Sequence, residues 1–197
     1  GAVRFLTPLE LGEAARWHLS AAEAGHSESQ FLIGTFFENG EGMPADNLKG
    51  SEWYRRAAEG GHGLAAFNLA YMLDVGQGVP TDEKDAFQWY EQAAGQGIAS
   101  AQCNLGAMYA QGRGTATDES AAVEWYGKAA AQGLASAQYN LALMHHHGRG
   151  VRTDPFRPLG RRGVDSRRGG IGGRFFGCSS RLRLHSSRPH PLRPCTI

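Results

Sequence analysis

The sequence predicts an all-α protein, a solenoid built by stacking copies of one helix hairpin. Three observations predict this fold class: a period of 36 residues, glycine breaks at fixed places in every period, and two helical segments between those breaks. The period keeps its length across four copies, which chance does not produce. The positions that share this step are Trp17, Trp53, Trp89 and Trp125; Gly40, Gly76, Gly112 and Gly148; Asp46, Asp82, Asp118 and Asp154.

The first half of a unit predicts one helix. The clearest copy of the unit occupies residues 99–133. Its small and apolar residues Ala101, Leu105 and Met108 stand at i, i+4 and i+7, which is one face of a helix. Gly112 follows, and glycine readily takes the left-handed conformation that ends a helix. We call this segment the first helix of the hairpin.

The second half of the unit predicts a second helix. Asp118 precedes it, and an aspartate at this place can accept hydrogen bonds from the free N–H groups of the first turn, worth about 1 kcal/mol. Residues 119–132 then place Ala122, Trp125 and Ala129 on one stripe. Each unit is therefore expected to be a hairpin.

Small residues recur at one position inside the first helices. A glycine in the middle of a helix costs about 1 kcal/mol relative to alanine, so its recurrence indicates a close helix–helix approach. The large Trp and Tyr side chains of the second helix are expected to fill the space, and stacked hairpins bury a core that one hairpin cannot. These small residues are Gly34, Ala70, Gly106 and Ala142.

The repeat frame divides the chain into six parts. Because the last first helix has no second helix to cover it, Leu141 and Met144 are expected to be exposed. The predicted parts are a partial repeat holding one second helix (1–26), three full repeats (27–62, 63–98 and 99–134), a partial fourth repeat (135–154) and a tail (155–197).

The tail departs from the frame and from the charge of the body. Where the frame requires Trp-Tyr, the chain has Arg161-Arg162, preceded by Pro158 and Gly160. Residues 155–197 carry ten Arg and one acid, whereas residues 1–154 have a net charge of −8. We expect the tail to be disordered. Two interpretations stay open: a frameshift or truncation product, and a genuine basic tail.

Neither the cysteines nor the apolar runs indicate a compartment. The three cysteines are Cys103, Cys178 and Cys195, and only the first lies in the repeats, so the pattern does not indicate a disulfide framework. No run reaches the roughly 18 apolar residues of a membrane span, and no signal peptide is visible. The localisation is therefore left unknown.

The repeats resemble the Sel1-like repeat family, a relative of the tetratricopeptide repeats. The resemblance rests on the run from Ala101 to Tyr109, the Gly112-x-Gly114 break, Asp118 and the run from Trp125 to Gly133. It covers roughly residues 8–154. The resemblance implies a right-handed α-α superhelix that serves as an adaptor or scaffold, as family members do in signalling, membrane-protein quality control and bacterial contact with host cells.

The related repeats imply a groove lined by the first helices. Aromatic and polar side chains that alternate along such a groove suit recognition of a peptide or a partner protein. The competing interpretation is that the aromatics serve packing between repeats. The groove residues expected by analogy are Phe31, Thr35, Glu38, Asn39, Phe67, Tyr71, Asp74, Ala107, Gln111, Tyr139, Leu143 and His146.

Other candidate sites favour structural roles. Asn68, Asn104 and Asn140 recur inside the first helices and are expected to hydrogen-bond a neighbouring turn. His145-His146-His147 is not expected to bind a metal, because consecutive helical residues point about 100° apart. No cofactor, no metal and no small-molecule substrate is expected.

Catalysis has no support in the repeats. No pairing of a nucleophile with a base recurs. Cysteine-rich members of the family are linked to lactam chemistry, but they carry a disulfide in each repeat and this chain does not. We therefore expect a non-catalytic protein. The alternative function is binding of nucleic acid or an anionic surface through the basic tail, where Phe175-Phe176 could stack on bases.

Overall fold

Eight helices make up the part of the chain that the structure describes. The computed structural model describes residues 8–151, and no strand occurs among them. The expected disorder of the tail and its proposed role in binding polyanions lie outside these residues. The helices are α1 (Pro8–Glu23), α2 (Ser27–Asn39), α3 (Asn47–Glu59), α4 (Gly63–Val75), α5 (Glu83–Gly95), α6 (Ala99–Gln111), α7 (Glu119–Ala131) and α8 (Ala135–His146).

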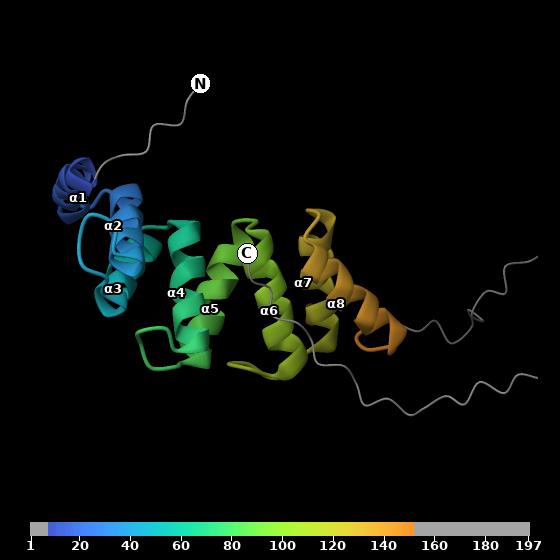
Figure 1. Cartoon of the computed structure of the whole chain (residues 1–197). Coiled ribbons are helices and arrows are strands. Elements are labelled where there is room, and N and C mark those ends of the chain that lie inside the picture. The colour runs from blue at the N-terminus through green and yellow to red at the C-terminus, as the bar shows by residue number, and fades with distance from the viewer. Residues whose placement is uncertain (1–7, 152–197) are drawn as a thin grey trace, which may run out of the picture. The chain divides into compact units, whose positions relative to one another are not determined.

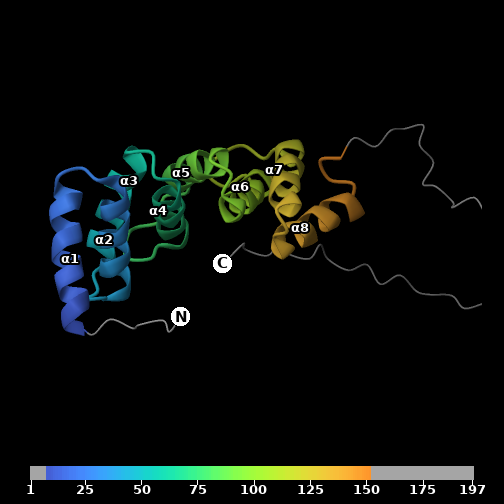
Figure 2. The ribbon, with the colours of Figure 1, turned by 90° about the horizontal axis from the view of Figure 1, so that it is seen from above.

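The helices form three hairpins with one extra helix at each end. Each helix packs on the helices that precede and follow it in the chain (Figure 1). Seen from above, α3, α5 and α7 lie along one side, and α4, α6 and α8 lie along the other (Figure 2). The predicted fold class, an all-α solenoid of stacked hairpins, is confirmed. No helix among residues 8–151 combines the length and the apolar character that crossing a membrane requires.

Helices α3, α5 and α7 begin after the predicted aspartates, and α2, α4 and α6 end at the predicted glycines. The carboxylate of Asp118 accepts a hydrogen bond from the backbone N–H of Ala121 at 2.9 Å, and Asp46 and Asp82 cap α3 and α5 in the same way. Gly112 ends α6 with a φ of 69°, a left-handed conformation that most residues avoid. The equivalent glycines end α2 and α4 with the same geometry.

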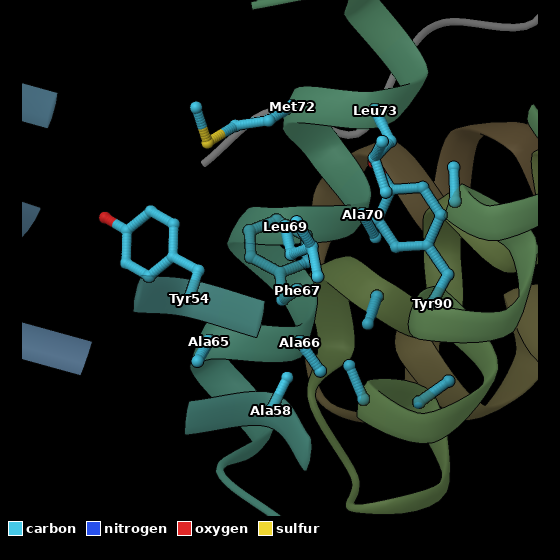
Figure 3. Packing of buried hydrophobic residues seen from close by; sticks show 14 of the residues in the cluster. Tyr54, Ala58, Ala65, Ala66, Phe67, Leu69, Ala70, Met72, Leu73 and Tyr90 are labelled. Carbon is cyan, nitrogen blue, oxygen red and sulfur yellow. The ribbon is translucent and has the colours of Figure 1, made fainter. Parts of the chain in front are cut away.

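One buried tyrosine per hairpin fills the space between helices. Tyr54, Tyr90 and Tyr126 have no exposed surface. Each lies over the small residue of its own first helix: a Cβ at Gly106 would stand 3.0 Å from the ring of Tyr126. Figure 3 shows Tyr90 beside Ala70 and Leu73 of the first helix of the same hairpin. The expected close approach of the two helices is confirmed.

The expectation that Met144 is exposed was wrong. Met144 is 1% exposed and Leu141 is half-buried. Met144 faces α7, the second helix of the preceding hairpin. This helix is present and packs on α8, so it covers Met144. The same holds for Met72, which lies on the side of α4 that faces Tyr54 of α3 (Figure 3).

Burial raises the pKa of all three core tyrosines above the ordinary value of 10.0. For Tyr54 the carboxylate of Glu38 adds to this effect, since it accepts a hydrogen bond from the hydroxyl and repels the phenolate. For Tyr90 the negative charge of Asp74 acts in the same direction. The folded solenoid therefore holds these side chains in the protonated form.

Glycine substitutions will separate strained sites from permissive ones. At Gly114, φ is 65° and an added Cβ would overlap the carbonyl oxygen of Glu83, so we expect Gly114→Ala to destabilise the protein by more than about 2 kcal/mol. Gly127 lies inside α7 with no atom within 4 Å of an added Cβ. We expect Gly127→Ala to stabilise by up to about 1 kcal/mol. Urea unfolding measures both, and equal effects of the two substitutions would contradict this account.

Alkaline pH will weaken the fold through the core tyrosines. Their folded-state pKa is raised, so the stability they contribute is fully present below pH 10.0 and is lost as pH rises above that value. Each group lowers the free energy of unfolding by up to about 1.4 kcal/mol per pH unit. We expect a smaller loss of stability with pH in Tyr126→Phe, because this variant has one titrating hydroxyl fewer in the core. The substitution removes no hydrogen bond, since the buried Tyr126 hydroxyl makes none within the described structure. Urea unfolding at a series of pH values tests this, and an identical slope in the variant would count against it.

Candidate functional site

The first helices α2, α4, α6 and α8 share one side of the solenoid, and we call the outward side of this layer the first-helix face. On α4 it carries Leu64, which is 48% exposed, and Val75, which is 51% exposed. The half-buried Tyr71 stands between them. Residues at i, i+7 and i+11 project from one side of a helix, so the three form an apolar strip along α4. We call Leu64, Tyr71 and Val75 the α4 strip.

Two of the aromatic groove candidates pack inside their own hairpins. The ring of Phe67 is 5% exposed and lies 6.0 Å from the ring of Tyr90, measured between centroids. Phe31 stands 5.8 Å from Tyr54 in the same way and stacks on His62 at 4.6 Å. The structure thus gives both phenylalanines a packing role inside a hairpin, whereas the competing interpretation expected Phe67 and Tyr139 to serve packing between repeats.

Two of the polar groove candidates form hydrogen bonds with the tyrosine of their hairpin. The hydroxyl of Tyr54 donates a hydrogen bond to Glu38 Oε2 at 2.6 Å and lies 3.2 Å from Thr35 Oγ1. Thr35 Oγ1 in turn donates to the backbone carbonyl of Phe31 at 3.1 Å. These contacts fix the side chains of α2 against α3 before any partner binds.

A ladder of hydrogen bonds links each hairpin to the next. The residue between the two glycines of the break reaches back 39 positions to the first helix of the preceding unit. Gln77 donates to Glu38 Oε1 at 3.1 Å, and Arg113 pairs with Asp74, whose side chain is 12% exposed. Arg149 donates to the carbonyl oxygen of Ala110. Glu38 and Asp74 therefore form contacts that link neighbouring repeats.

The other predicted residues differ in exposure. Asn39 and Gln111 are exposed at the ends of α2 and α6, and Gln111 Oε1 accepts a hydrogen bond from Arg113 Nε at 2.9 Å. Ala107 is 4% exposed. On α8, Leu143 is half-buried, whereas His146 is exposed and Tyr139 is 43% exposed.

The recurrent asparagines lie against the core tyrosines. Asn104 Nδ2 donates to the hydroxyl of Tyr90 at 3.0 Å, so one of its partners is a side chain of the preceding hairpin. Asn68 makes the same kind of contact with Tyr54, where it opposes the rise in the tyrosine pKa. These contacts support the structural role, and the expected hydrogen bond to a neighbouring turn stays a prediction.

Sequence reasoning missed Leu64 and Asn68 as members of the first-helix face. Together with Tyr71 and Val75 they stand at i, i+4, i+7 and i+11 along α4. Phe67 was predicted to line the groove but is buried. The exposed side of α4 is therefore rotated about the helix axis by about one residue relative to the predicted side. Counting helical positions back from Val75 would have found both residues.

The charges of the body are unequally distributed between the two kinds of helix. The first helices carry Glu28, Glu38 and Asp74 but no Lys or Arg. Among residues 8–151 the basic side chains stand on second helices or in the breaks. The first helices thus carry carboxylates without Lys or Arg, and Arg113 of the break pairs with Asp74. Within the described residues no three His, Cys, Asp or Glu side chains come together as a metal site.

Comparisons with known proteins agree on the family. The model of the Sel1 repeat matches residues 10–26, 27–62, 63–98, 99–134 and 135–157. Search of the curated proteins gave no match. The crystal structure of a protective antigen present in uropathogenic Escherichia coli strains, which displays an SLR fold, is similar to the chain with a TM-score of 0.66 and 35% identity. A Sel1 repeat protein from Oxalobacter formigenes has the same two values.

The coverage of these structures is partial. The similarity to the Escherichia coli antigen covers 70% of this chain and 29% of that one; for the Oxalobacter protein the shares are 71% and 56%. Helicobacter pylori cysteine rich protein B has a TM-score of 0.54 at 21% identity over 69% of this chain and 98% of its own, which shows the fold alone. The family model matches well over half of the sequence. The chain belongs to the Sel1 repeat family.

Proposed function

We propose that the chain is a non-catalytic interaction scaffold that binds a peptide or a partner protein on its first-helix face. Sel1 repeat proteins are generally protein-interaction scaffolds and typically have no catalytic role. The observation that carries the proposal for this chain is the α4 strip, where Leu64 and Val75 expose about half of their surface.

The packing of the other candidates supports this choice. Phe31, Phe67, Glu38 and Asp74 are occupied by contacts inside and between hairpins. The α4 strip places apolar side chains that reach solvent along one side of a single helix. A rigid apolar anchor can bind a partner with a small loss of conformational entropy, which is how interface hot spots act.

The surroundings of the strip indicate the polarity of its partner. The first helices bear three carboxylates and no Lys or Arg. Complementary charge mainly raises the rate of association and the specificity of an interface. We therefore expect an apolar segment flanked by neutral or basic residues to be preferred over an acidic one.

Substitution of the α4 strip will weaken partner binding without unfolding the scaffold. We expect the variant Leu64→Ser/Tyr71→Ala/Val75→Ser to recover the partner at least about tenfold less in affinity capture, equivalent to about 1.4 kcal/mol of binding free energy. Circular dichroism melting must show that the variant keeps its fold. The retained partner is identified first with the unaltered chain.

A matched control stands on the opposite layer. Glu52, Gln88 and Glu124 are exposed on α3, α5 and α7, and the triple alanine variant at these positions should capture the partner as well as the unaltered chain does. Equal recovery by the strip variant, or a loss confined to the control, would reject the first-helix face as the binding surface.

A further inference from the structure

The three core tyrosines occupy the same repeat position but differ in their hydrogen bonds. The hydroxyl of Tyr54 donates to Glu38 Oε2 at 2.6 Å and lies 3.2 Å from Thr35 Oγ1. The hydroxyl of Tyr90 accepts a hydrogen bond from the next hairpin at 3.0 Å. Tyr126 is buried just as completely, yet its hydroxyl makes no hydrogen bond within the described structure. Because buried polar groups in proteins are almost always paired, Tyr126 is the exception that needs a reason.

Two alanines account for the difference. The two partners of the Tyr54 hydroxyl on α2 stand 16 and 19 positions before that tyrosine. The same steps back from Tyr126 reach Ala110 and Ala107 on α6. A methyl group neither donates nor accepts a hydrogen bond. The third hairpin therefore keeps the tyrosine but lacks both side chains that serve its hydroxyl in the first hairpin.

The ladder between repeats lacks a carboxylate at the same place. In its first two steps, the break residue meets Glu38 or Asp74 on a first helix. In the third step Arg149 meets Ala110, so its guanidinium donates to the backbone carbonyl oxygen at 3.3 Å. Arg149 Nε also donates to Glu119 Oε1 at 2.6 Å. The side chain of Arg149 is 35% exposed, so solvent reaches it.

Positive charge acts on the Tyr126 hydroxyl. Burial raises the pKa of this group, and the guanidinium groups of Arg149 and Arg113 oppose the rise. Near Tyr54 and Tyr90 a carboxylate raises the tyrosine pKa further. The surroundings of Tyr126 thus combine an unused hydrogen-bond donor with nearby positive charge, which suits an oxygen acceptor that carries negative charge.

We propose that the third hairpin binds the carboxylate group of a ligand, with the Tyr126 hydroxyl and the Arg149 guanidinium as its donors. The carboxylate accepts from Tyr126 as Glu38 does from Tyr54. The short side chain of Ala110 leaves room where the earlier repeats carry a carboxylate, and the guanidinium exchanges the Ala110 carbonyl oxygen for the ligand. The site is built by α6, α7 and the break after α8, so it is independent of the α4 strip and of the charge preference proposed there.

Titration of the full 197-residue chain with sodium acetate at pH 7, with sodium chloride holding the ionic strength constant, tests the site. We expect a saturable shift of the Arg149 Nε–H resonance in NMR spectra. Tyr126→Phe removes the donor but keeps the ring. It should weaken binding at least about tenfold, because a hydrogen bond to a charged group is lost. Tyr90→Phe is the matched control in the second hairpin and should bind acetate as the unaltered chain does.

A carboxylate supplied by the chain itself gives a second test. Ala110→Asp copies the residue of the second hairpin, so it should abolish the shift that acetate causes and should raise the melting temperature. The rise should be smaller when Tyr126→Phe is also present, because the donor is then missing. Steric blocking of the site would abolish the shift without this dependence on the hydroxyl.

Three small carboxylates distinguish the source of the group. N-acetylglycine imitates the C-terminus of a chain, N-acetylaspartate N-methylamide imitates an acidic side chain, and acetate represents a free acid. The compound that binds most tightly identifies the class of ligand. Absence of a saturable shift with all three would overturn the proposal. So would equal affinity in Tyr126→Phe and the unaltered chain, or an equal gain from Ala110→Asp with and without the hydroxyl.

Discussion

The structure depends on the packing of one tyrosine from the second helix of each full hairpin against the neighbouring first helices. Tyr90 lies over Ala70 and 6.0 Å from Phe67 in its own hairpin, and its hydroxyl accepts a hydrogen bond from Asn104 of the next hairpin at 3.0 Å. Its ring cannot reach both helices unless the residue beneath it is small, which explains the Gly or Ala inside every first helix. Burial, helix spacing and stacking therefore follow from a single contact that recurs every 36 residues.

This packing leaves little chemistry for any other purpose. On the first helices, Glu38 and Asp74 serve the ladder with Gln77 and Arg113. Asn104 contacts the hydroxyl of Tyr90. The raised tyrosine pKa values arise from burial in the core and mark no reactive site. The proposed recognition surface is the α4 strip, where Leu64 and Val75 reach solvent.

Most of the fold could be predicted from the sequence because its signals are local. Asp118 at a helix start and Gly112 at a helix end act within one turn, and the prediction holds at both. The candidate site was harder, since it depends on which side of α4 meets the neighbouring hairpins. Phe67 was assigned to the groove but packs on Tyr90, and Leu64 was overlooked although it is exposed. Met144 was misjudged because the sequence frame does not say which neighbour covers each helical face.

The central claim is that a buried tyrosine couples the hairpins on both of its sides. Native-state hydrogen exchange on a Tyr90→Ala variant tests it most directly, since loss of a large buried ring costs about 3–5 kcal/mol. The account predicts faster exchange in both α4 and α6, the helices that Tyr90 contacts, with α2 much less affected. Faster exchange confined to α5, with α4 and α6 protected as in the unaltered chain, would contradict it.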